Sequence, residues 1–321
     1  MNLEYERAML VMNEVKKVVT GKDDCVKKAM AAILAGGHIL IEDVPGVGKT
    51  TLATAFSKAM KLDNRRVQFT PDVMPADILG FTMYHKEKGL FEFHPGPIMC
   101  NLFLADEINR TSPKTQSALL EVMEEGFVSV DGETRSVPNP FIVIATQNPK
   151  GSAGTQLLPE SQLDRFMICM SMGYPDLKSE IAIAKGKSSR MAMSEVQAVA
   201  GSTQLLQMRE EAEQTYIHNN IITYIVKLSA ATREHPLVEL GISPRGTIAC
   251  TKMVKAWAFL NGRNYVTPED VETVFPDVAK HRLVLNTKAR VTHVTEAAVV
   301  EEILTKVKQP ASYMGRTEYR G

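Results

Sequence analysis

A lysine, two threonines and two glycines follow a short apolar run in the segment HILIEDVPGVGKTT, residues 38–51. Lys49 could reach the β- and γ-phosphates of a nucleotide, and the hydroxyl of Thr50 could ligate Mg²⁺. Gly46 and Gly48 allow backbone N–H groups to turn inward and form a concave nest for an anion. A helix that begins here would direct its positive dipole end at the same anion. The segment therefore predicts a site for a nucleotide and Mg²⁺ whose phosphate contacts come from Val44, Pro45, Gly46, Val47, Gly48, Lys49, Thr50 and Thr51.

One position departs from the complete phosphate-loop pattern G-x-x-x-x-G-K-[ST]. The first glycine of the pattern is replaced by Asp43. Aspartate tolerates unusual backbone angles better than most residues, so the turn can still form. A carboxylate beside a triphosphate is unfavourable, and we expect its side chain to point away from the phosphates. The alternative interpretation is an ordinary strand–turn–helix with a surface lysine.

Two carboxylates, Asp106 and Glu107, end a second apolar run at residues 101–105. Carboxylates at the end of a buried strand are costly unless they have a function. In an open parallel sheet this end of the strand faces the ligand crevice. Asp106 is suited to hold Mg²⁺ from the outer side of its coordination shell, and Glu107 is suited to activate the attacking water. The alternative is a structural pair that caps the helix expected after Pro113.

Two further polar residues have positions that suit phosphate chemistry. Asn148 follows a third apolar run, residues 141–146, where its amide could hold a water molecule or a phosphate. Ser243 and Pro244 predict a helix start, which places Arg245 in the first turn. Positive charge there opposes the helix dipole, so Arg245 is better explained by an anion that it contacts.

The remaining pattern predicts which elements position these residues. Strands are expected at 38–41, 66–69, 101–105, 141–146 and in a run that ends at residue 170, and helices at 3–19, 24–34, 51–60 and 113–125. The Asp-Gly pair at 131–132 predicts a hairpin over 127–137. The segment 70–97 is too long for an ordinary connection, so a functional insertion is expected. Beyond residue 175 helical periodicity dominates to about residue 308, and the tail from 309 is expected to fray.

Composition excludes several classes of protein. The 321 residues carry 37 basic and 37 acidic side chains, and this neutral balance disfavours a nucleic-acid binder. The four cysteines are isolated in sequence, which indicates neither a zinc site nor a disulfide framework. We expect a cytoplasmic protein without a membrane segment, because the N-terminal sequence lacks a signal-peptide core and no apolar run approaches about 18 residues. No histidine is assigned a role.

Long runs of the sequence resemble the MoxR family of AAA+ ATPases. The resemblance is densest in LAGGHILIEDVPGVGKT, VQFTPDVMPADILG, the run from FHPGPIMC to IVIATQNP and LPESQLDRF, with a weaker match in GISPRGTIA. It implies an α/β fold: a P-loop AAA+ core with a five-stranded parallel sheet between helices, in residues 1–190. A smaller all-α lid domain is expected in residues 191–321.

The resemblance also implies roles for individual residues. Gly46, Gly48, Lys49 and Thr50 correspond to Walker A, with Asp106 and Glu107 as Walker B; Thr50 and Asp106 would be the metal ligands. The catalytic set would be Glu107, Asn148 as sensor 1, Arg165 as the arginine finger and Arg245 as sensor 2. Arg110 is a second candidate for an arginine at a subunit interface.

The resemblance implies partners as well. Family members form hexameric rings, so a homo-oligomeric ring is expected, in which Arg165 enters the neighbouring subunit's site. Residues 70–80 correspond to the helix-2 insert and the hairpin 127–137 to the pre-sensor-1 hairpin, which face a central pore or a partner. Clients with von Willebrand factor A domains are implied. The segment 149–157, PKGSAGTQL, departs from the family pattern.

Three functions follow as hypotheses. The leading one is a ring-forming ATPase that remodels, matures or assembles other proteins. The second is an AAA+ motor that acts on nucleic acid, or in metal insertion as in the magnesium chelatases. The third is a nucleotide-gated scaffold that binds ATP without hydrolysing it, for which Asp43 is the sole support.

Overall fold

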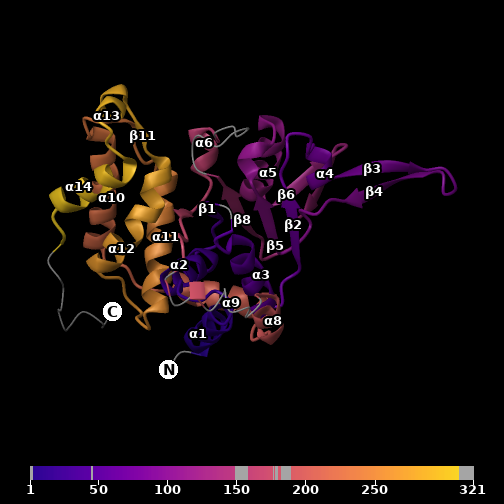
Figure 1. The fold of residues 1–321 in the computed structure, drawn as a ribbon, viewed down its shortest axis with the longest axis horizontal. Helices are drawn as coiled ribbons and strands as arrows, with labels where there is room; N and C mark the ends of the chain where they lie inside the picture. The colour runs from indigo at the N-terminus through magenta and orange to yellow at the C-terminus, as the bar shows by residue number, and fades with distance from the viewer. Residues whose placement is uncertain are drawn as a thin grey trace. The chain divides into compact units, whose positions relative to one another are not determined.

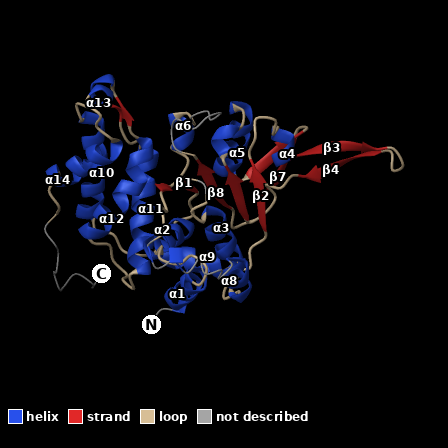
Figure 2. Cartoon of the chain, viewed as in Figure 1, coloured by secondary structure: helices blue, strands red, loops and turns tan. Residues whose placement is uncertain are grey.

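The computed structural model describes residues 3–44, 46–148, 158–175, 177, 180–181 and 189–310, with the side chains of 189–191 left out. The chain divides into two compact units, and the division falls after Ala212. Figures 1 and 2 show the helices and strands of both units. Within the described ranges, no helix combines the length and the apolar character that a membrane crossing requires.

The first unit is built around a parallel sheet, which confirms the predicted fold class. Five strands of the described chain form it in the order β2-β5-β8-β1-β9. Their bounds are β1 Ile39–Glu42, β2 Asn64–Gln68, β5 Leu102–Asp106, β8 Ile142–Gln147 and β9 Ile168–Met170. The strands β1, β5, β8 and β9 are apolar in consecutive positions because both faces of the sheet are covered.

The register of the strands places the polar strand ends at one edge. Glu42 is opposite Gln147 in the β1–β8 pair, and Gln68 is opposite Asp106 in the β2–β5 pair. Since all these pairs are parallel, the residues that follow β1, β5 and β8 emerge side by side.

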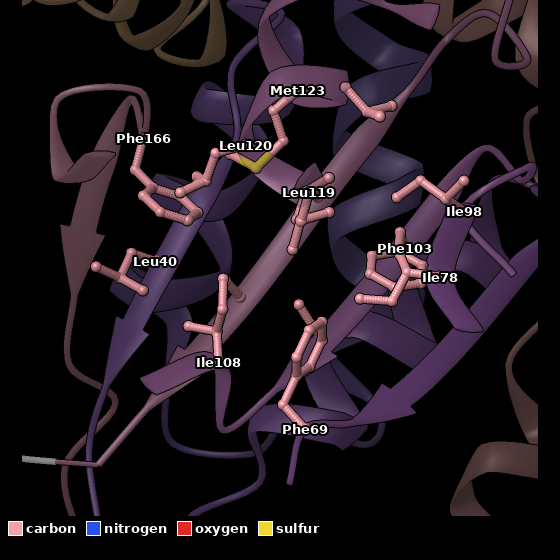
Figure 3. Packing of buried hydrophobic residues seen from close by; sticks show 14 of the residues in the cluster. Leu40, Phe69, Ile78, Ile98, Phe103, Ile108, Leu119, Leu120, Met123 and Phe166 are labelled. Carbon is pink, nitrogen blue, oxygen red and sulfur yellow. The ribbon is translucent and has the colours of Figure 1, made fainter. Parts of the chain in front are cut away.

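Helices cover the two faces of the sheet. One face packs against α5 (Pro113–Glu125), whose Leu119, Leu120 and Met123 share a buried cluster with Leu40 and Phe103 of the strands (Figure 3). The other face is covered by α3 (Lys49–Ala59), which contacts β5, while α1 (Leu3–Lys16) packs on α3 and on α2 (Asp23–Leu34). The 3₁₀ turn η1 (Ile108–Arg110) follows β5, and α6 (Glu160–Leu163) precedes β9.

The segment 70–97 is ordered, and sequence reasoning missed its elements. It contains α4 (Pro75–Leu79), β3 (Gly80–His85) and β4 (Leu90–Pro95), and the last two form an arm that extends away from the sheet (Figure 1). The hairpin predicted around Asp-Gly is confirmed as β6 (Phe127–Val130) and β7 (Glu133–Ser136). The guanidinium carbon of Arg135 lies 4.0 Å from the centre of the Phe93 ring, which links the two hairpins.

The first unit extends beyond the boundary expected after residue 190. The helix α8 (Ser189–Glu195) spans that position, and α9 (Ser202–Glu213) follows it. Lys58 Nζ donates to the Met193 carbonyl at 2.6 Å, and Arg209 Nε donates to the Ile33 carbonyl at 2.9 Å. These helices therefore belong to the core, because they pack on α2 and α3.

The second unit is mainly helical, and it also contains a short antiparallel pair of strands. That pair, β10–β11, is an addition to the all-α lid expected from the sequence. The elements are α10 (Asn219–Glu234), β10 (Val238–Leu240), α11 (Pro244–Leu260), α12 (Pro268–Ala279), η2 (Lys280–Arg282), β11 (Val284–Leu285), α13 (Thr287–Val291) and α14 (Glu296–Lys306).

His38 connects three elements at the start of β1. Its Nδ1 accepts a hydrogen bond from Val143 N at 3.0 Å, and its Nε2 lies 3.0 Å from the Met123 carbonyl oxygen. The imidazole must therefore be neutral, with its proton on Nε2. Burial lowers the pKa of His38 from 6.5 to about 4, although the Met123 carbonyl opposes this shift.

The stability of the core should consequently fall in acid. Between pH 6.5 and about 4 the unfolded chain binds a proton at His38 that the folded chain excludes, so protons favour unfolding. We expect this residue to remove about 1.4 kcal/mol per pH unit in that window. Thermal melts of wild type and His38→Gln from pH 7.5 to 4.5 measure the effect. As the pH falls, His38→Gln should lose stability less steeply than wild type. His85→Gln is the control, and its stability should fall as steeply as that of wild type. Parallel slopes for wild type and His38→Gln would contradict this role.

Candidate active site

The loop between β1 and α3 has the backbone of an anion nest. Gly46 has φ of 89° and Gly48 has φ of 98°, a region that residues with a Cβ rarely adopt. A Cβ at Gly46 would meet nothing within 4 Å, so backbone conformation, not space, requires glycine there. Gly48 is the N-cap of α3, which directs the N-terminal N–H groups of that helix into the loop. Pro45 lies outside the described residues.

Lys49 is held at the mouth of this loop. Its Nζ donates to the Asp43 carbonyl oxygen at 2.7 Å, and the residue is 8% exposed. Burial lowers the pKa of Lys49, while the negative charges of Asp43, Asp106 and Glu107 oppose the shift. An ammonium group oriented in this way can transfer from one carbonyl oxygen to a phosphate oxygen with little rearrangement.

Asp43 has a structural function in this chain. Its Oδ2 accepts hydrogen bonds from Ser171 Oγ, Met172 N and Gly173 N at 2.9, 2.7 and 2.6 Å, and its Oδ1 accepts one from Val44 N at 2.8 Å. Burial acts to raise the pKa of Asp43, but these hydrogen bonds outweigh it and lower the pKa. The carboxylate is thus directed at the segment after β9.

A buried threonine positions the acidic pair. Thr146, at the end of β8, is fully buried. Its hydroxyl donates to Asp106 Oδ1 at 2.6 Å and accepts from Glu107 N at 2.9 Å. Glu107 has φ of 56°, an uncommon value for a residue with a Cβ, and this bond helps to maintain it.

Each carboxylate of the acidic pair also has an arginine of the same chain as its partner. Arg66 on β2 donates to Asp106 Oδ2 through Nη2 at 2.7 Å and through Nε at 3.2 Å. Arg110 on η1 donates to Glu107 Oε2 at 2.7 Å. Arg110, which the sequence left as a second candidate for an interface arginine, is thus engaged within its own chain.

Asn148 completes the polar edge of the sheet. Asn109 accepts from Asn148 N at 3.4 Å and donates to the Asn148 carbonyl at 3.3 Å, which fixes the backbone. The side-chain oxygen of Asn148 is buried and has no hydrogen-bond partner among the described residues. A buried acceptor of this kind is costly unless a ligand or water donates to it.

These residues fit a nucleotide with Mg²⁺. The nest, the helix N-terminus and Lys49 are suited to phosphate oxygens, and the hydroxyl of Thr50 and the carboxylate of Asp106 are oxygen ligands of the type Mg²⁺ prefers. The unpartnered oxygen of Asn148 offers a place for a water molecule. The residues predicted as Walker A, Walker B and sensor 1 therefore follow the C-terminal ends of neighbouring parallel strands, on the same side of the sheet.

Arg165 lies at the opposite end of the sheet. It precedes β9, where the strands begin: Met167 N donates to the His38 carbonyl at 2.8 Å, and Ile168 pairs with Ile39. Its Nε is 3.2 Å from Glu124 Oε2 on α5. The parallel strands separate this arginine from the loop after β1 in the same chain.

Arg245 belongs to the second unit, where it is exposed in the first turn of α11. Ser243 caps the helix by accepting from Gly246 N at 3.2 Å, as the sequence predicted. A Cβ at Gly246 would lie 2.6 Å from Ile242 Cγ2 and 2.8 Å from Arg282 Cδ, so close packing explains a glycine in this turn.

Sequence reasoning missed Thr146, Asn109 and Arg66. Thr146 and Asn109 each lie next to a predicted polar strand end, so their positions could have indicated them. Arg66 lay in a predicted strand, but nothing in the sequence pairs it with Asp106. The departing segment 149–157 lies outside the described residues.

Comparison with known proteins identifies relatives along more than nine-tenths of the chain. Residues 38–168 match the ATPase family associated with various cellular activities (AAA), and residues 230–303 match the AAA lid domain. The chain is 44% identical to the uncharacterized protein YeaC of Bacillus subtilis, over 93% of each sequence. It is 38% identical to Chaperone MoxR1 of Mycobacterium tuberculosis, over 95% of this chain and 82% of the relative. A crystal structure of a candidate ATPase from Cytophaga hutchinsonii is 38% identical, covers 95% of both chains and has a TM-score of 0.87.

Replacing Asp43 by glycine, which restores the full phosphate-loop pattern, should harm the protein. The change removes the acceptor of four hydrogen bonds, and a hydrogen bond to a charged group contributes about 1.5–3 kcal/mol. We expect a loss of at least about 2 kcal/mol in unfolding free energy by chemical denaturation. Asp43→Asn, which keeps the shape of the side chain and one acceptor oxygen but has a donor amide in place of the other oxygen, serves as the matched variant and should lose less. An Asp43→Gly protein as stable as wild type would refute the structural role.

Proposed function

Because the chain belongs to the MoxR family of AAA+ ATPases, we propose that it hydrolyses ATP with Mg²⁺ and uses the energy to remodel, mature or assemble partner proteins. The observation that carries the proposal is the acidic pair Asp106–Glu107, fixed by Thr146 at the strand edge that also presents Lys49. This arrangement combines an anion site with a candidate base.

Each residue of the edge has a task in this reaction. The N–H groups after Gly46 and Lys49 bind the phosphates, and Mg²⁺ held by Thr50 and Asp106 would neutralise charge on the β- and γ-phosphates. Glu107 is the residue that orients the attacking water and accepts its proton. The side-chain oxygen of Asn148 accepts a second hydrogen bond from that water, which aligns it with the phosphorus atom.

We propose that Arg165 acts in a neighbouring subunit. It lies at the strand-start end of the sheet, so it is poorly placed for the phosphates of its own chain, and it would exchange its contact with Glu124 for one in a second copy. A guanidinium supplied in this way stabilises transition-state charge only when the subunits assemble. A head-to-tail contact of this type closes into a ring, and we propose a hexamer. Arg245 is proposed to contact the γ-phosphate from the lid.

The clients are proposed to be proteins with von Willebrand factor A domains. The similarity to Chaperone MoxR1 supports a protein client in general. The arm β3–β4 supports it too, since it exposes large apolar side chains: Phe81, Met83, Tyr84, Leu90 and Phe91. Neutral net charge makes nucleic acid a weaker choice of partner.

Two inactive variants should restore activity when mixed. Glu107→Gln removes the base and Arg165→Ala removes the arginine, so each alone should bind fluorescent mant-ATP but lose most ATP hydrolysis. In an equimolar mixture, some of the interfaces between neighbouring subunits (seams) combine an intact Glu107 of one subunit with an intact Arg165 of the next. Random assembly makes such seams about a quarter of the total, and ATPase activity should recover to about that fraction of wild type.

A mixture of Lys49→Ala with Glu107→Gln is the matched control, because both changes affect the same half of the seam and no intact site forms. Wild-type hydrolysis by Glu107→Gln would refute the assignment of the base. Absence of recovery in the Arg165→Ala mixture would refute action in trans.

A further inference from the structure

Arg66 forms an ion pair with Asp106, the carboxylate that is proposed to bind Mg²⁺. The two arginine nitrogens Nη2 and Nε contact the same oxygen, Oδ2, at 2.7 and 3.2 Å. The other oxygen, Oδ1, accepts from the Thr146 hydroxyl. Both oxygens of Asp106 are thus engaged by groups of the same chain.

The two partners of Asp106 differ in their freedom to leave. Thr146 is fully buried on a central strand. The Arg66 side chain is 53% exposed, whereas that of Asp106 is 11% exposed. Arg66 lies on β2, an outer strand of the sheet, and its Nη2 also donates to Gln68 Oε1 at 3.2 Å, which keeps the guanidinium within reach when it moves. Arg66 is therefore the partner that can yield.

A guanidinium and a divalent cation compete for the same negative charge. A carboxylate paired with arginine attracts Mg²⁺ less strongly than an unpaired one, because the positive charge of the guanidinium offsets part of the attraction between the carboxylate and the metal. Replacing the ion pair requires the arginine to return to water, which its exposed position permits at small cost.

We propose that Arg66 is an internal competitor of Mg²⁺ at Asp106 and thereby sets the Mg²⁺ concentration at which the site binds nucleotide productively. This inference rests on the proposed nucleotide site. In the metal-free protein Arg66 neutralises the charge of Asp106; when Mg²⁺ enters, Arg66 turns out toward Gln68 and solvent. The residue acts through Asp106, so it is a positioning residue.

The test measures how Mg²⁺ and mant-ADP assist each other's binding in the full chain, without hydrolysis. The affinity for mant-ADP is determined by fluorescence over a series of Mg²⁺ concentrations for wild type and Arg66→Ala. Loss of the competitor should lower the Mg²⁺ midpoint by about two- to fivefold, the range of a partly exposed ion pair. Arg66→Gln, which keeps the length of the side chain but not its charge, should give a shift in the same direction.

Arg65→Ala is the matched control. Arg65 is the preceding residue of the same strand, carries the same charge and pairs with Asp63 at 3.7 Å instead of Asp106. It should leave the Mg²⁺ midpoint unchanged, which separates local competition from a general change in charge. Equal midpoints in wild type, Arg66→Ala and Arg66→Gln, with mant-ADP bound in all three, would overturn the inference while the nucleotide site stands. Failure of wild type to bind mant-ADP at any Mg²⁺ concentration would overturn the proposed function itself.

Discussion

The hydroxyl of Thr146 joins the two strands on which the chemistry depends. It donates to Asp106 and accepts from the backbone of Glu107, so one buried group sets both the metal ligand and the unusual backbone of the base. This bridge requires β5 and β8 to be neighbours and parallel, with ends that coincide. The consecutive apolar residues of those strands, and the helices that cover them, supply that arrangement.

The charged side chains around Thr146 are paired with groups of the same chain. Asp106 faces Arg66, Glu107 faces Arg110, and Lys49 rests on a carbonyl oxygen close to three carboxylates. Such pairing lets a cluster of ionised groups stay at the edge of a buried sheet before any ligand arrives. A phosphate chain with its metal would exchange these internal partners for ligand partners, so binding replaces existing interactions and does not have to create charge in an apolar setting.

Local sequence patterns predicted much of this structure. Glycines with a following lysine, carboxylates after an apolar run and an Asp-Gly turn each have a cause within a few residues, and the structure contains all three. What escaped prediction depends on contacts between distant residues. The partners of Asp43 come from the segment after β9, Arg66 meets a residue on the next strand, and α9 joins the core through Arg209 and the Ile33 carbonyl. The arm β3–β4 was missed because proline and glycine at its ends concealed an alternating pattern.

The most direct test of this account is the hydrolysis rate of Thr146→Val at saturating Mg²⁺ and ATP. Valine keeps the shape of threonine but can neither donate to Asp106 nor accept from Glu107. Since small displacements of catalytic groups are costly, the account predicts a fall of about 10- to 100-fold in kcat, with nucleotide affinity nearly unchanged. A Thr146→Val protein that hydrolyses ATP at the wild-type rate would show that the acidic pair does not depend on this bridge.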